Sequence, residues 1–297
     1  MRVMTVSAWM DRDERAGGDG PEGALFPWWS FTKTVMSICA LRLAEAGALD
    51  LEEPLPGRPC STLHLMAHRT GVRDYGGLES YHKAVASGDA PWPVARLLDE
   101  AGADTPLWPP GHGFAYSNIG YLELRDVLER AAGCDMGRMV ARLITGPLGL
   151  TSVSLATTPQ DFERIHWGSA GGYHPAWVYH GCLMGNASDA ARLLHAVMTG
   201  GLISAASLRK MQTSHFTGGA IPGRPWSEIG YGLGLMQGAV QELGRALGHS
   251  GCGSFCANAV YHFPDTGVTV ASFTDGGNEA PAEWEATRIA REIAASR

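Results

Sequence analysis

The stretch SFTKTVMSICALRLAEAG, residues 30–47, decides the fold. It predicts a helix, because Ser30 stands where an N-cap residue belongs and Gly47 stands where a C′ glycine belongs. The stretch is apolar on nearly every side, so we expect the helix to be buried between layers. Lys33 lies inside it, and a lysine is almost never buried without a reason. The stretch therefore predicts a central helix with a functional lysine near its start.

The segments before and after this helix differ in character. Residues 3–10 are a short strand candidate. Residues 60–195 consist of helical segments joined by loops rich in proline and glycine, and Ser188 stands where the last of these helices begins. The middle of the chain is therefore predicted to be helical.

Strand-length runs dominate after about residue 225. They include YGLGLMQ (231–237) and SFCANAVYHF (254–263), and PDTG (264–267) is a good hairpin turn. The last segment, 280–296, is again helical. This order predicts an antiparallel meander followed by a terminal helix.

The fold class expected from this order is α+β, with an antiparallel sheet flanked by helices and an inserted helical lobe. Residues 1–59 and 196–297 would form the sheet lobe, and residues 60–195 would form the helical lobe. A chain of 297 residues suits one large domain or two closely packed ones.

Composition narrows the range of partners. The net charge is −7 and the basic residues form no patch, so a nucleic-acid partner is not expected. No apolar stretch is long enough for a membrane span, and the first residues lack the apolar core of a secretory signal. We therefore expect a cytoplasmic protein that does not enter membranes, unless an upstream leader is missing.

Cysteine and histidine spacings give no sign of a disulfide or a metal site. The six cysteines form no C-x-x-C, and Cys252 and Cys256 fall in one predicted strand, too far apart to bridge. His64 and His68 have a spacing that can chelate zinc, but no acidic third ligand stands near them. We expect reduced thiols, no metal and no cofactor.

The pattern S-x-x-K places a serine and a lysine on one helix face, where the amine can take the hydroxyl proton. All three lysines of the chain stand in this pattern, at 30–33, 80–83 and 207–210. The last two lie in polar stretches and are interpreted as surface pairs. Lys33, with its apolar surroundings, makes Ser30 the predicted nucleophile.

A second motif, Y-x-N, occurs once, at 116–118. A tyrosine hydroxyl beside a lysine ammonium is easier to ionise, so Tyr116 is a candidate second acid and base. Asn118 would donate its amide to the substrate and accept a hydrogen bond from Lys33. Alone, the motif also fits a loop that caps a helix.

The stretch GHSGC, 248–252, resembles a nucleophile elbow but lacks its last glycine. An α/β-hydrolase with Ser250 as nucleophile would need a helix directly after it, and the following residues are typical of a strand. The glycines would let this strand lie close to an acyl group.

Taken in order, SFTK, YSN and HSG resemble the three boxes of the serine β-lactamase and penicillin-binding-protein superfamily. The branch with class C β-lactamases, serine D-peptidases and family VIII esterases is the most similar. LMAHRTGVRDY, PPGHGFAYSNIGYLEL, GPLGLTSV, GNASDAARLLHAVMTGG and YGLGL extend the resemblance over about residues 24–275.

The resemblance implies a β-lactamase/transpeptidase-like fold with its site in the cleft between two lobes. Carried over to this chain, Ser30 is the acylated nucleophile, Lys33 its base and Tyr116 the second acid and base. The third box, His249, Ser250, Gly251 and Cys252, would line the cleft edge, where Ser250 could touch substrate. The backbone N–H groups of Ser30 and Cys252 would bind the oxyanion.

Two features depart from the family pattern. The third box usually begins with lysine, and His249 here resembles the esterase and aminopeptidase members more. A neutral imidazole holds a substrate carboxylate less firmly than an ammonium, so we expect little action on β-lactams. The segment before residue 3 is short, which would expose a sheet edge that a homodimer contact or an altered pocket could cover.

These motifs predict a serine hydrolase that cleaves a small ester or amide through an acyl-enzyme, as an esterase or a D-amino-acid peptidase. The alternatives are acyl transfer by the same residues, a weak β-lactamase or penicillin-binding protein, and a non-catalytic binding relative. Nine tryptophans, Trp28 and Trp29 among them, could give the cleft aromatic walls.

Overall fold

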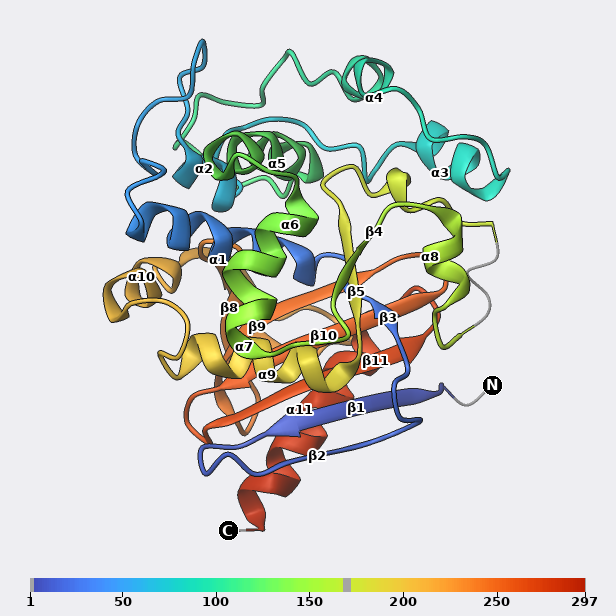
Figure 1. Cartoon of the computed structure of the whole chain (residues 1–297), viewed down its shortest axis with the longest axis vertical. Coiled ribbons are helices and arrows are strands. Elements are labelled where there is room, and N and C mark those ends of the chain that lie inside the picture. The colour runs from blue at the N-terminus through green and yellow to red at the C-terminus, as the bar shows by residue number, and fades with distance from the viewer. Residues whose placement is uncertain (1–2, 168–171, 297) are drawn as a thin grey trace.

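An antiparallel sheet built from both ends of the chain forms the centre of the structure (Figure 1). The computed structural model describes residues 3–167 and 172–296. The strands lie in the order β2-β1-β11-β10-β9-β8-β7-β6. Their bounds are β1 Thr5–Met10, β2 Ala16–Asp19, β6 His215–Gly219, β7 Trp226–Tyr231, β8 Met236–Val240, β9 Gly244–Cys252, β10 Cys256–Phe263 and β11 Val268–Asp275. The sheet confirms the predicted fold class.

Helices cover both faces of this sheet, because its central strands are apolar on both sides. In β11, Val270 faces the C-terminal helix, whereas Phe273 belongs to the core on the other face. The C-terminal helix α11 (Ala280–Ala295) packs on one face, and α1 (Phe31–Glu45) and α9 (Ala187–Met198) pack on the other.

The central helix α1 is buried along nearly its whole length, as its apolar composition predicts. It ends as expected, with Gly47 in the left-handed conformation at φ 71°. One core cluster joins α1 to the sheet below it and to the helical segments above it. The helix therefore lies between the sheet and the inserted helical segment, and its first turn lies where these two layers meet.

The inserted segment between α1 and α9 is helical, as predicted (Figure 1). Its elements are α2 Thr62–Met66, α3 Glu79–Ala86, α4 Val94–Ala101, α5 Asn118–Ala132, α6 Met136–Val140, the π-helical turn η1 Ala141–Thr145, α7 Gly146–Leu148, α8 Pro159–Glu163 and the 3₁₀ turn η3 Pro175–Trp177. A small sheet, β3 (Phe26–Pro27), β5 (Cys182–Gly185) and β4 (Ser154–Ala156), joins this segment to the start of α1. After α9, the short helix α10 (Ala205–Met211) leads into β6.

Three local predictions are wrong. The N-cap of α9 is Asn186, whose side chain accepts a hydrogen bond from the backbone N–H of Asp189, and Ser188 lies inside the helix. The stretch 231–237 is a turn between the ends of β7 and β8, because its glycines allow the reversal. Cys252 and Cys256 lie in two different strands, joined by a turn.

The division into lobes stays a prediction, with one adjustment that we propose. The predicted boundary at residue 195 falls inside α9, which packs on β1, β10 and β11. His195 itself contacts the hydroxyl of Thr269 in β11. We therefore propose that the sheet lobe resumes at the start of α9. Within the described ranges, no helix is long and apolar enough to cross a membrane.

Candidate active site

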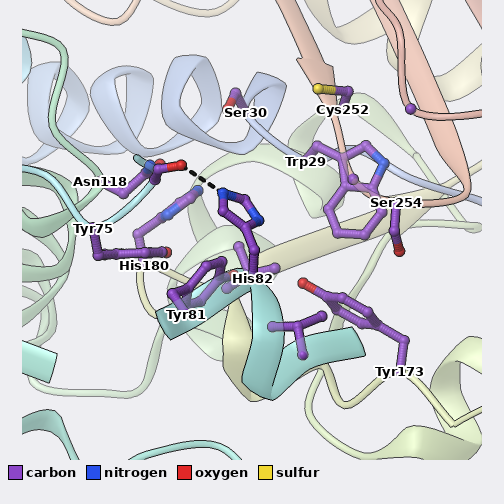
Figure 2. Close-up of a pocket in the computed structure, with 15 residues that line it drawn as sticks. Trp29, Ser30, Tyr75, Tyr81, His82, Asn118, Tyr173, His180, Cys252 and Ser254 are labelled. Atoms are coloured by element: carbon purple, nitrogen blue, oxygen red, sulfur yellow. Dashed lines mark hydrogen bonds between the residues drawn. The ribbon is translucent and has the colours of Figure 1, made fainter. Parts of the chain in front are cut away.

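The start of α1 brings Ser30 to the wall of a cavity of about 560 Å³ (Figure 2). Just before it, Trp29 has a φ of 40°, a conformation that costs free energy in any residue with a side chain. Ser30 already has helical backbone angles, and its side chain does not cap the helix. Ser30 is thus the N-cap residue of α1, as predicted, and its hydroxyl is available to partners other than the helix backbone.

The hydroxyl of Ser30 meets the two partners that the motifs predicted. Its Oγ lies 3.1 Å from Nζ of Lys33 and 2.9 Å from Oη of Tyr116. Lys33 reaches it from one turn along α1, and Tyr116 reaches it from the loop before α5. The fold thus assembles a serine, a lysine and a tyrosine around one oxygen atom.

Burial makes Lys33 unusually easy to deprotonate. The side chain is fully buried, and removal from water lowers the pKa of its amine to about 7. The negative charge of Asp74 opposes this shift but does not cancel it. A large share of the Lys33 amine is therefore unprotonated near neutral pH.

His180 is a partner of Lys33 that sequence reasoning did not find. Its Nε2 lies 3.2 Å from Nζ of Lys33, and its ring lines the cavity. Burial and the charge of Lys33 hold the pKa of His180 well below its ordinary value, so the ring is neutral. We therefore assign Nε2 as the acceptor of a hydrogen bond from Nζ of Lys33. The loop between η3 and β5 places this histidine, and no spacing rule in the sequence links it to Lys33.

Tyr116 is harder to ionise than the motif suggested. Burial of its hydroxyl raises the pKa of Tyr116 well above its ordinary value, and the charge of Asp74 adds to the effect. The amine of Lys33 lies over the ring, 5.0 Å from its centroid. The expected lowering of this pKa is therefore wrong, and Tyr116 is suited to donate a proton.

Asn118 lines the same cavity but is held by another partner. Its backbone N–H donates to Oδ1 of Asp74 at 2.7 Å, and its side-chain amide donates to Oδ2 at 3.0 Å. The structure gives it no hydrogen bond to Lys33 among the residues described. The acceptor role expected of Asn118 is filled by His180 instead.

Strand β9 carries the third box past Ser30, and its alternation sends neighbouring side chains to opposite faces. Gly251 faces Ser30, and a Cβ on it would lie 2.5 Å from the Ser30 backbone nitrogen. Only glycine permits this close approach. Cys252, at the end of the strand, lines the cavity with Gly253 and Ser254.

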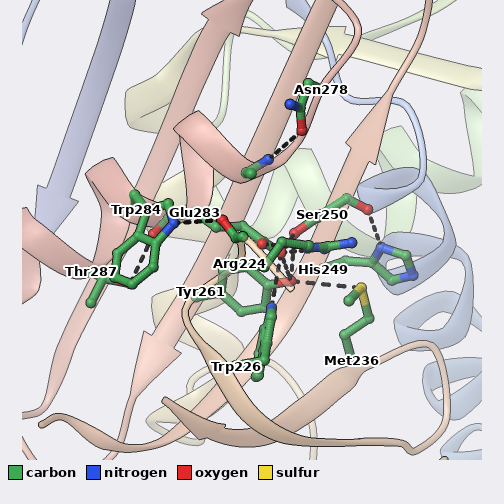
Figure 3. Close-up of polar contacts among 12 residues, drawn as sticks. Arg224, Trp226, Met236, His249, Ser250, Tyr261, Asn278, Glu283, Trp284 and Thr287 are labelled. Carbon is green, nitrogen blue, oxygen red and sulfur yellow. Dashed lines mark hydrogen bonds and ion pairs between the residues drawn. The ribbon is translucent and has the colours of Figure 1, made fainter. Parts of the chain in front are cut away.

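Ser250 points away from the cavity, toward α11 (Figure 3). Its hydroxyl donates to a carboxylate oxygen of Glu283 and lies 2.6 Å from the hydroxyl of Tyr261. Glu283 is also bound by Arg224 and by the indole N–H of Trp226. This buried network leaves Ser250 no path to a substrate. A strand that follows Ser250 also excludes the nucleophile elbow.

His249 lies behind the site rather than on its surface. Only 1 % of it is exposed, and its Nε2 lies 2.9 Å from the hydroxyl of Tyr231. Burial, assisted by the charge of Lys33, lowers the pKa of His249 to about 3, so the ring is neutral. The structure therefore places His249 where it does not contact a ligand in the cavity.

Aromatic side chains form much of the cavity wall (Figure 2). Of the tryptophans expected there, Trp29 lines the cavity, whereas Trp28 is fully buried. Tyrosines supply the rest of the aromatic surface. The lining residues are Trp29, Ser30, Tyr75, Gly76, Tyr81, His82, Val85, Asn118, Tyr173, Val178, His180, Cys252, Gly253, Ser254 and Gly277.

The other two S-x-x-K pairs lie on the surface, as interpreted from the sequence. Lys83 is 73 % exposed and pairs with Glu79, one turn earlier in α3. Lys210 is 43 % exposed and pairs with Glu52. Burial thus distinguishes Lys33 from the two other lysines.

A serine at the start of a buried helix, with a buried lysine of lowered pKa one turn along and an antiparallel strand passing beside it, is the arrangement of an acyl-transferring serine enzyme. A protein-family model named Beta-lactamase matches residues 5–295. The chain belongs to the Beta-lactamase family.

Individual relatives agree with this family. Penicillin-binding protein 4* of Bacillus subtilis (strain 168) is 28 % identical over 153 residues, which cover 48 % of this chain and 33 % of that protein. D-aminopeptidase of Gluconobacter oxydans (strain 621H) is 29 % identical over 106 residues, 36 % of this chain and 19 % of that protein. The matches thus span a third or less of these two curated relatives.

The fold itself has a well-matched solved counterpart. The structure of D-amino acid amidase from Ochrobactrum anthropi SV3 superposes with a TM-score of 0.81 and covers 99 % of this chain and 96 % of that one. Its sequence identity is 20 %, so the likeness concerns the fold.

Proposed function

We propose that this chain is a serine hydrolase that cleaves a small ester or amide through an acyl-enzyme on Ser30. The observation that carries the proposal is the convergence of Lys33 Nζ and Tyr116 Oη on Ser30 Oγ, at 3.1 Å and 2.9 Å. The nucleophile lies at the wall of the cavity, whereas Lys33 is shielded from water behind it. This is the arrangement that an activated serine needs.

Acylation begins with proton transfer from Ser30 to Lys33. With a pKa of about 7, a large share of Lys33 is neutral amine at neutral pH and can accept the proton. Oγ of Ser30 then bonds to the carbonyl carbon. The ammonium formed on Lys33 keeps a hydrogen bond to Nε2 of His180, so its charge is not left without an acceptor.

Tyr116 is the proton donor to the leaving group in this proposal. Its raised pKa keeps the hydroxyl protonated until a basic oxygen or nitrogen departs, and the proton on Lys33 then restores it. A water molecule attacks the acyl-enzyme next and gives its proton to the same pair, and the pair returns a proton to Oγ of Ser30 as the bond between Oγ and the acyl carbon breaks. Hydrolysis therefore consumes one water and returns every group to its starting state.

The oxyanion would lie between the backbone N–H groups of Ser30 and Cys252. At the start of α1, the backbone N–H groups of Phe31 and Thr32 donate to the carbonyls of Trp28 and Trp29. These turn hydrogen bonds do not use the N–H of Ser30. Gly251 lets β9 approach the start of α1, and Cys252, the next residue, lines the same cavity as Ser30. The two donors thus belong to two elements that the fold holds in contact.

The cavity favours an acyl group that is aromatic or apolar and carries no carboxylate. Tyr75, Tyr81 and Tyr173 supply aromatic surface, and the described lining contains no arginine or lysine. His249, neutral and buried, does not provide a positive charge. Little action on β-lactams, which carry a carboxylate, therefore remains our expectation, and the names of the D-aminopeptidase and D-amino acid amidase relatives support an amide or peptide substrate.

A panel of substrates tests the proposal. Short-chain aryl esters, D-amino-acid anilides and a chromogenic cephalosporin would be assayed with the wild type, with Ser30→Ala and with the surface variant Ser80→Ala. We expect hydrolysis of an ester or anilide by the wild type and Ser80→Ala alone. Equal activity in Ser30→Ala contradicts the proposal. Added alcohols or amines that divert the product would favour acyl transfer by the same residues. A homodimer and a cytoplasmic location stay predictions.

A further inference from the structure

A second cavity, of about 460 Å³, lies apart from the one at Ser30 and shares no lining residue with it. It is formed where α2 and the loop after it meet α10, β6 and the turn after β7. We call it the Arg69 pocket. Its lining residues are Glu52, Ser61, Leu63, His64, Ala67, Arg69, Lys210, Thr213, His215 and Leu233.

Arg69 is a half-buried cation without a carboxylate partner among the residues described. One of its terminal nitrogens donates to Nε2 of His215 at 3.2 Å, and the other donates to the carbonyl of Gly111. A guanidinium has five N–H donors, so the protein leaves part of this group unused. Arginine is suited to bind a planar carboxylate through two parallel hydrogen bonds.

Two histidines line the same pocket. Nδ1 of His64 accepts the backbone N–H of Ser61 at 3.1 Å, so we assign the ring proton to Nε2. Nε2 of His215 accepts from Arg69, which assigns its proton to Nδ1. Burial and the charge of Arg69 lower the pKa of both rings. Each neutral ring keeps one N–H that these contacts do not use.

The remaining lining explains why the ligand should be partly apolar. Glu52 is the acidic residue of the pocket, and it is neutralised by Lys210 at a distance of 2.7 Å. Leu63, Ala67 and Leu233 form an apolar wall. A charged group at Arg69 would therefore be followed by a small hydrocarbon part against this wall.

We propose that the Arg69 pocket binds a small carboxylate with a short apolar tail. The carboxylate would pair with Arg69 and accept from Nε2–H of His64, and the tail would lie on the leucines. His215, whose Nε2 accepts from Arg69, would hold the guanidinium in place. Such a ligand supplies the negative charge that the half-buried guanidinium lacks. The inference does not depend on the hydrolase proposal, because it concerns binding alone.

Isothermal titration calorimetry of the full chain with butyrate tests this binding. We expect saturable binding to one site in the wild type and in Ser30→Ala, and at least tenfold weaker binding in Arg69→Gln, which keeps the size of the side chain but removes its charge. Arg69→Lys, which keeps the charge without the paired geometry, should be intermediate. Arg142→Gln, at an exposed arginine, should bind like the wild type.

Three outcomes would overturn the proposal. The first is the absence of saturable butyrate binding to the wild type, and the second is equal affinity in Arg69→Gln. The third is tighter binding of the uncharged butyramide or of inorganic phosphate, since either would show that the pairing of a carboxylate with an apolar tail is not what the pocket selects. Circular dichroism of each variant confirms that it is folded before titration.

Discussion

Nζ of Lys33 lies 3.2 Å from Nε2 of His180, so the buried amine of α1 has an acceptor from the loop before β5. Both groups are buried, and burial together with the charge of Lys33 holds the pKa of His180 well below its ordinary value, because two cations would repel in a space without water. The neutral imidazole can therefore accept a hydrogen bond from Nζ of Lys33, whether the amine is protonated or not. This contact links the two parts of the chain that form the cavity wall at Ser30.

Replacing His180 tests whether this contact supports catalysis. We expect His180→Leu to lower kcat/KM about 10- to 100-fold, because the Lys33 ammonium formed during acylation loses its acceptor. His180→Gln keeps an acceptor oxygen and should recover most of the activity. The measurement is the steady-state rate of aryl-ester hydrolysis, with the pH profile of each variant.

The comparison of these two variants separates catalysis from packing. A merely structural role for His180 predicts that Leu and Gln differ in thermal stability but leave the pH profile unchanged. Equal kcat/KM and equal pH profiles in both variants would show that the contact with Lys33 has no part in the reaction.

Activity should rise with pH as Lys33 loses its proton. The base must be neutral in the free enzyme, and the pKa of Lys33 is about 7, so kcat/KM is expected to increase through that value and to level off above it. Lys33→Ala should lower kcat/KM about 10³-fold, within the range that a positioned general base contributes. Lys83→Ala, at an exposed site, is the matched control and should stay within about twofold of the wild type. A flat profile from pH 5 to 9 would count against Lys33 as the base.

Gly251→Ala should disable the site through geometry alone. The added Cβ would lie 2.5 Å from the backbone nitrogen of Ser30 and 2.9 Å from Cβ of Trp29, and neither is a flexible side-chain end. The strand must then move away from the nucleophile, and loss of one oxyanion donor typically costs about 10²–10³ in rate. Gly219→Ala, where a Cβ meets nothing within 4 Å, is the control for a glycine in a strand of the same sheet. Activity near the wild-type level in Gly251→Ala would refute the close approach.

His249 should make the protein lose stability as the pH falls. The unfolded chain protonates this histidine near pH 6.5, whereas the folded chain resists until about pH 3. Between these values the unfolded state binds the extra proton, so the free energy of unfolding falls by up to about 1.4 kcal/mol per pH unit for this residue. Above pH 6.5 the effect disappears.

Urea unfolding of His249→Gln at pH 6, 5 and 4 measures this contribution. The variant should lose less free energy of unfolding per pH unit than the wild type, and the difference should match the contribution of one histidine. His112→Gln, at an exposed position, is the control. Parallel stability curves for the wild type and His249→Gln would show that His249 is protonated in the folded chain at these pH values.

Much of the fold could be predicted from the sequence, because it depends on periodicity and on helix ends. The apolar helix that ends at Gly47, the PDTG hairpin and the terminal helix are local patterns, and the structure confirms all three. Two local predictions are wrong for another reason, namely the N-cap at Ser188 and the strand at 231–237. At those points several polar or glycine residues stand together, and local propensity does not say which of them ends the element.

The site was predicted only where its residues share a motif. Ser30 and Lys33 lie one helical turn apart, and Tyr116 belongs to a box with a known place in the fold. His180 and Asp74 reach the site from loops, so their contacts depend on tertiary packing. The motifs predict the wrong direction for the pKa of Tyr116, because they indicate a nearby lysine, whereas the burial of the hydroxyl is visible only in the folded structure. The motif also predicts Ser250 at the cleft edge, but strand alternation turns its side chain to the other face of the sheet, where it contacts Glu283.

Intact-mass spectrometry of the protein, quenched with acid during turnover of an aryl ester, tests the central claim most directly. The account predicts that the wild type gains the mass of one acyl group, that peptide mapping places it on Ser30, and that Ser30→Ala shows no gain and no turnover while remaining folded. An acyl group on any other residue, or undiminished turnover by Ser30→Ala, would contradict it.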